Sequence, residues 1–73
     1  MKKRPFIVLE LADMFVRDGE RCLRSRGEIG INTDYLETFT DNQVFMKGKS
    51  DPIWVMECVE EIIDTIYFEG EEE

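Results

Sequence analysis

The side chains best suited to chemistry in this sequence are four carboxylates near its C-terminal end. Glu57, Glu60, Glu61 and Asp64 recur at spacings that would place them on one face of a helix. Neighbouring carboxylates can act as general acid and base or bind a divalent cation. Here the shared face is expected to be exposed, where nothing tunes the groups for catalysis, and no second set of ligands accompanies them. We therefore predict no metal site and no catalytic residue.

The remaining catalytic repertoire is sparse. The 73 residues include no histidine, which removes the commonest general base and all histidine-dependent dyads and triads. Cys22 and Cys58 are the two cysteines, and two thiolates cannot complete a structural zinc site alone. The five glycines are scattered and form no phosphate-binding loop. We expect a protein that is not an enzyme and that uses no cofactor.

The N-terminus has the basic start of a secretory signal peptide. Lys2, Lys3 and Arg4 precede an apolar run, but Glu10 and Asp13 interrupt that run before it reaches the usual length. No apolar segment approaches the ~18 residues needed to span a bilayer. We expect a cytoplasmic protein that does not bind membranes and whose two cysteines are reduced and buried.

A C-terminal helix is the element that would position the carboxylates. Ser50-Asp51-Pro52 combines an N-cap residue with a proline suited to the first helical position. Beyond it, apolar residues recur at spacings of three and four, opposite the acidic side chains. The pattern predicts an amphipathic helix over residues 52–68, with Trp54 in its first turn.

A β-hairpin is predicted immediately before this helix. Residues 35–40 and 43–47 are rich in aromatic and β-branched types, and they flank Asp41-Asn42, which tolerates a tight turn.

The region 6–25 allows two interpretations. Glu10, Asp13 and Arg17 have helical spacing, whereas Asp18-Gly19 suits a turn between two strands. We favour the strands, because a small antiparallel sheet offers a face on which the C-terminal helix can pack. A helix over residues 6–25 is the alternative.

These elements predict an α+β fold, a small antiparallel sheet of hairpins packed by one C-terminal amphipathic helix. Residues 1–70 would form a single small domain, and residues 71–73 a frayed acidic tail. Met14, Met46 and Met56 are expected to fill gaps in the core. A chain of this size buries only about 60% of the surface that it exposes when unfolded, so binding to a partner is a common way to gain stability.

Charge is divided unevenly along the chain. The net charge is -8, made up of +3 over residues 1–26 and -11 over residues 27–73. An acidic helix face can dock on a basic surface, and complementary potentials speed the encounter. A solvated face that keeps a small domain soluble is the plainer interpretation.

The combination favours a small acidic protein-interaction module. We expect it to bind and inhibit a larger nucleic-acid-processing protein, such as RNA polymerase or a nuclease, by steric and electrostatic occlusion. A short, acidic, single-domain chain is common among small regulators and among virus-encoded proteins that bind host machinery, which is an analogy of composition alone. The expected partner-binding residues are Trp54, Glu57, Glu60, Glu61 and Asp64.

Two alternatives remain open. Basic residues of the first third could bind nucleic-acid phosphates directly, although four acids lie among them; they are Lys2, Lys3, Arg4, Arg17, Arg21, Arg24 and Arg26. If this region forms strands, its arginines would instead offer carboxylate-binding forks at a protein interface. The other alternative is a homo-oligomeric structural component, with a homodimer as its simplest form.

Overall fold

The computed structural model describes residues 2–68 of the chain. Its elements in order are β1 (Lys2–Lys3), β2 (Phe6–Arg17), β3 (Glu20–Asn32), the 3-10 turn η1 (Thr33–Tyr35), β4 (Leu36–Thr40), β5 (Gln43–Met46), β6 (Ile53–Trp54), α1 (Val59–Ile66) and β7 (Tyr67–Phe68). The predicted α+β class, with antiparallel sheets and a C-terminal helix, is confirmed. The predicted acidic tail lies outside the described residues.

A long antiparallel hairpin of β2 and β3 occupies most of the first half of the chain. The preference for strands over residues 6–25 is therefore right, and the alternative helix is wrong. Asp18 and Gly19 form the turn with φ angles of 54° and 80°. Positive φ at both positions defines a type I′ turn, whose twist matches that of the flanking strands.

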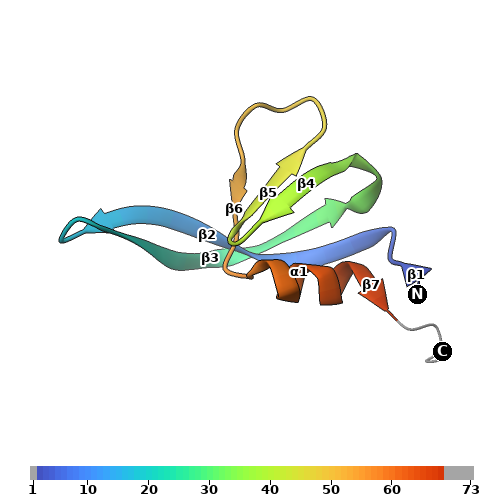
Figure 1. Ribbon diagram of the computed structural model, residues 1–73, viewed down its shortest axis with the longest axis horizontal. Coiled ribbons are helices and arrows are strands. Elements are labelled where there is room, and N and C mark those ends of the chain that lie inside the picture. Colours follow the sequence, from blue (N-terminus) through green and yellow to red (C-terminus); the bar gives the residue numbers. More distant parts are fainter. Residues whose placement is uncertain (1, 69–73) are drawn as a thin grey trace.

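A β-bulge divides this hairpin into two parts. Arg26 is an extra residue in β3, between the partners of Leu11 and Ala12. Gly27 beside it has a φ of 114°, which residues with a side chain rarely adopt. Beyond the bulge the hairpin leaves the body of the molecule and projects alone (Figure 1). We call residues 13–26 the arm; none of them is buried.

A second antiparallel sheet contains β4, β5 and β6 in that order. The predicted turn at Asp41-Asn42 joins β4 to β5, and Asn42 has a φ of 67°. After β6 the chain reaches the side of β2 that β3 leaves free, where Val55 forms a β-bridge with Leu11. This crossing joins the two sheets.

The helix α1 is shorter than the predicted span of 52–68. The segment ahead of it is extended because its backbone bonds other strands: the N–H of Val55, for example, donates to the carbonyl of Asn42 at 3.0 Å. The local start signal at the proline is overridden by these long-range hydrogen bonds. Trp54 consequently lies in β6, and Glu57 precedes the helix.

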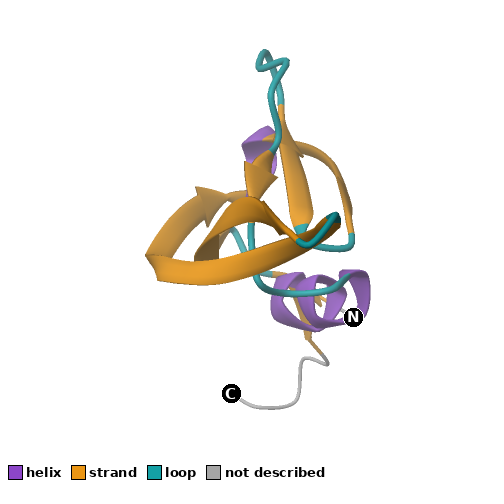
Figure 2. Ribbon diagram, turned by 90° about the vertical axis from the view of Figure 1, so that its left-hand side faces the viewer, coloured by secondary structure: helices purple, strands orange, loops and turns teal. Residues whose placement is uncertain are grey.

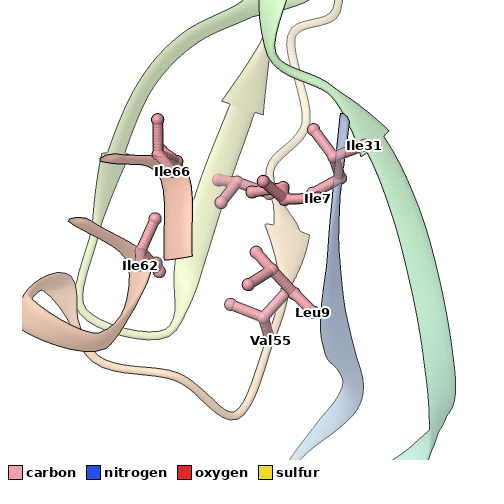
Figure 3. Close-up of a cluster of buried hydrophobic side chains, with 7 residues drawn as sticks. Ile7, Leu9, Ile31, Val55, Ile62 and Ile66 are labelled. Atoms are coloured by element: carbon pink, nitrogen blue, oxygen red, sulfur yellow. The ribbon is translucent and has the colours of Figure 1, made fainter. Parts of the chain in front are cut away.

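The core fills the space between the base of the long hairpin, the second sheet and α1. Figure 2 shows the second sheet above the hairpin and α1 below it. Seven buried side chains from these elements form one cluster (Figure 3): Ile7, Leu9, Ile31, Val44, Val55, Ile62 and Ile66. Met46 packs against the cluster as predicted, whereas Met14 lies on the arm and is 38% exposed. The cysteines are free but only half-buried.

The two ends of the described chain meet beside α1. β1 pairs with β7, with Lys3 opposite Tyr67. The N–H of Arg4 donates to the carbonyl of Ile66 at 2.7 Å, and its Nη1 donates to that of Thr65 at 2.8 Å. The last carbonyls of a helix lack partners within it, so the N-terminal segment completes the end of α1. No helix within residues 2–68 is long and apolar enough to cross a membrane.

Candidate interaction surfaces

Three of the predicted partner-binding carboxylates, Glu60, Glu61 and Asp64, lie exposed on α1, and two of them share one side. Glu60 and Asp64 are one turn apart and both face solvent. Ile63, 38% exposed, belongs to the same side, because at 3.6 residues per turn these three positions fall within an arc of about 100°. Tyr67, the extended C-cap residue that begins β7, follows directly after the helix and is also 38% exposed. We call these four residues the outer face of α1.

The other two carboxylates accept hydrogen bonds from the backbone. Oε1 of Glu61 accepts the N–H of Cys58 at 3.1 Å, which caps the first turn of α1. Both carboxylate oxygens of Glu57 accept a hydrogen bond from the backbone N–H of Glu10, at 3.1 and 3.0 Å. The predicted row of four carboxylates on one helical face is therefore wrong. Glu57 lies outside the helix, and its side chain adds to the hydrogen bonds between the preceding residues and β2.

Trp54 is separated from the outer face of α1. It is half-buried in β6, where it pairs with Gln43 of β5. The expectation that Trp54 and the helical carboxylates share one element is not met, because the backbone hydrogen bonds that extend this segment remove Trp54 from the helix.

The turn at Asp41-Asn42 has a role that the sequence analysis missed. Oδ1 of Asp41 accepts the N–H of Val59 at 2.8 Å, so this turn also caps α1. Nδ2 of Asn42 lies 3.0 to 3.3 Å from the carbonyl oxygens of residues 55, 56 and 57. Residues 55–57, which run from β6 to the free edge of β2, are called the crossing segment. The two side chains therefore hold the crossing segment and the start of α1 against the second sheet. Their residue types predict a turn but do not indicate its distant partners.

The predicted basic surface is divided between opposite ends of the molecule. One group, Lys2, Lys3 and Arg4, lies at the C-terminal end of α1, where positive charges interact favourably with the negative end of the helix dipole. The other basic residues lie on the arm, at the far end in Figure 1: Arg17, Arg21, Arg24 and Arg26. The seven residues do not form one continuous site.

The arm has two different faces, because successive residues of a strand point to opposite sides. The guanidinium carbons of Arg17 and Arg24 lie 5.9 and 5.3 Å from the ring centroid of Phe15, within the range of cation–π attraction. On the opposite face, Met14 and Val16 are 38% and 65% exposed. One face of the arm therefore combines Phe15 with charges of both signs, because Asp13 and Glu20 share it with the two arginines. The other face combines apolar side chains with Arg21.

An open cavity of about 300 Å³ lies beside the bulge. Its lining includes the carboxylates of Glu10, Glu28 and Glu57, and the first two are directly opposite each other in the hairpin. Like charges at opposed positions repel. Within residues 2–68, no group of three or more histidine, cysteine or acidic side chains is arranged to hold a metal ion.

No protein-family model, curated protein or solved structure matches this chain. A functional interpretation therefore depends on the geometry and charge of these surfaces.

Proposed function

We propose that this protein is a non-enzymatic interaction module that binds a basic surface of a larger protein. The observation that carries the proposal is the outer face of α1, where two exposed carboxylates lie beside an exposed isoleucine and an exposed tyrosine. Interfaces commonly combine an apolar or aromatic contact with surrounding charges. In the described part of the chain, the ion pairs Lys3–Asp34 and Arg26–Asp13 involve neither carboxylate of this face.

Nucleic-acid-handling proteins in the cytoplasm are the partner class that we propose. Such proteins carry lysine and arginine surfaces that neutralise phosphates, and an acidic module competes for the same surfaces. The net charge of -8 favours this encounter at long range. The module would inhibit by occlusion, without chemistry.

Direct nucleic-acid binding has weaker support. The basic side chains form two separate groups, and Asp13, Asp18 and Glu20 lie among the arginines of the arm. Phosphate binding needs a continuous basic surface, which this distribution does not provide.

The test is affinity capture from a nuclease-treated lysate of the native or host cell. It compares the tagged wild type with the variant E60Q/D64N and with the control E37Q/D51N. The control removes the same charge from two exposed positions outside α1. Glu57 and Glu61 are left intact, because their loss would remove backbone acceptors.

We expect wild type and control to retain the same nucleic-acid enzyme, and E60Q/D64N to lose it. With that enzyme purified, E60Q/D64N should associate about tenfold more slowly at low salt, and the difference should shrink as salt is added. Equal retention by both variants would contradict the assignment to the outer face of α1. Retention that disappears after nuclease treatment would support nucleic-acid binding instead.

A further inference from the structure

The outer edge of β2 is a free strand edge over residues 13–17. In an antiparallel pair, alternate residues direct their backbone groups at the partner strand. Arg17 faces Glu20 across the two-residue turn, so the odd-numbered residues bond β3. Met14 and Val16 therefore direct their N–H and C=O groups away from β3, and no described strand pairs with them.

The same edge is already paired closer to the body. There the N–H of Met56 donates to the carbonyl of Glu10 at 2.9 Å, and Val55 forms its bridge with Leu11. The crossing segment thus ends the available edge on one side, and the turn at Asp18 ends it on the other. Five residues of β2 remain open to an incoming strand.

We propose that a second copy of this chain occupies that edge, with the two arms paired antiparallel about a two-fold axis at Phe15. The sequence Asp13-Met14-Phe15-Val16-Arg17 is complementary to itself in this arrangement. Asp13 lies opposite Arg17 of the second copy at both ends, Met14 lies opposite Val16, and the two phenylalanines meet at the axis. Opposite charges and apolar pairs at facing positions stabilise antiparallel strands.

Backbone geometry supports the same register. Met14 and Val16 both have outward backbone groups, so each can exchange two hydrogen bonds with its counterpart in the second copy. Moving the axis to Met14 would place Asp13 opposite Phe15, and moving it to Val16 would place Arg17 there. Only the axis at Phe15 pairs the charges.

The dimer would also cover exposed apolar surface. Val16, at 65% exposure, would lie beside Met14 of the second copy, and edge strands with such residues are prone to pairing. Five paired residues bury less than the ~1,200 Å² of a standard interface, so the association is weak. It uses none of the residues of the outer face of α1, and the two proposals stand or fall separately.

A charge exchange tests the register. In D13R both flanking charges become positive, and in R17D both become negative, so two copies of either variant repel each other. D13R also removes the Arg26–Asp13 ion pair and R17D places two acids opposite each other in the hairpin, so recovery of dimers in the mixture is the result that identifies pairing between copies. Wild-type mass, measured by sedimentation equilibrium from about 10 µM to about 1 mM, should rise from 8.6 kDa towards twice that value. Each variant alone should remain monomeric, and an equimolar mixture of the two should again form dimers.

A proline provides a second test with a matched control. Val16→Pro removes an outward N–H that the monomer does not use, and proline is tolerated at such edge positions. Leu23→Pro removes the equivalent outward N–H from β3, on the other edge of the arm. We expect Val16→Pro to weaken dimerisation at least about tenfold and Leu23→Pro to leave it nearly unchanged. A wild type that stays monomeric throughout, a mixture that does not recover dimers, or equal losses from the two prolines would overturn the proposal.

Discussion

Asn42 is the position at which the attachment of the crossing segment to the second sheet can be measured. Its side-chain amide has two donors, shared among three carbonyl oxygens 3.0 to 3.3 Å away, and its backbone has a φ of 67°. Asn42→Gly removes the donors but keeps the freedom to adopt positive φ. Asn42→Ala removes the donors and also penalises that conformation.

The expected magnitudes follow from these two contributions. Two net hydrogen bonds are worth about 1–3 kcal/mol together, which is the expected loss for Asn42→Gly. The left-handed backbone adds about 1–2 kcal/mol for Asn42→Ala. Asn42→Asp offers lone pairs and a negative charge to three carbonyl oxygens, so we expect a loss at least as large as that of the glycine variant. A domain of this length has a free energy of unfolding of about 4–11 kcal/mol, so each change is a large fraction of it.

Urea denaturation is the appropriate assay, with fluorescence from Trp54, the chain's one tryptophan, as the probe. Its half-buried position in β6, next to the crossing segment, makes its emission sensitive to unfolding. A glycine variant as stable as wild type would refute the role of the side-chain amide. Equal losses for glycine and alanine would refute the role of the backbone conformation.

Two further substitutions probe the long hairpin. Glu57→Ala should lower the free energy of unfolding by about 1 kcal/mol, because the N–H of Glu10 loses a charged acceptor but remains open to water. Glu57→Gln keeps an acceptor and should lower it by less. An alanine variant as stable as wild type would contradict this role of Glu57. Gly30→Ala should also cost about 1 kcal/mol, because the new Cβ would lie 3.1 Å from Cε2 of Phe6 and closer still to its Cζ, which forces the ring to move. Thermal unfolding of Phe6→Ala with and without Gly30→Ala provides the comparison, and a cost that persists without the ring would point to a different cause.

The turns of this fold could be predicted because their chemistry is local. Asp18-Gly19 and Asp41-Asn42 combine residues that tolerate positive φ with β-forming neighbours, and both form the expected turns. Local signals over residues 6–25 were divided between a helix and two strands, and the correct choice of strands depended on the expectation that the C-terminal helix packs on a sheet.

The start of α1 could not be predicted because distant residues determine it. The spacing of Val55, Met56 and Val59 fits a helix, but the first two bond Asn42 and Glu10 as extended backbone. Hydrogen bonds between residues so far apart in sequence leave no local signal. The error moved Glu57 and Trp54 onto a face to which they do not belong.

The candidate surfaces were predicted in part. Helical spacing correctly predicted that Glu60 and Asp64 share one side of the helix. The capping role of Glu61 could not be predicted in this way, because it depends on where the helix begins. The exposure of Met14 and Val16 had no signature, because an apolar strand that extends beyond the core has the same residue pattern as one within it.

The pairing of β1 with β7 determines when α1 is completed during folding. Arg4 and Thr65 are 61 positions apart, and the entropic cost of closing a loop rises with its length. The turn at Asp18-Gly19 instead joins β2 to β3 across two residues, so the long hairpin can form at the outset. The joining of the chain's two ends then comes late, and until it does the last turn of α1 lacks the donors of Arg4. Of the surface on which we expect a partner to dock, the C-terminal part is therefore expected to be completed after the first turn, which Asp41 and Glu61 cap without the N-terminal segment.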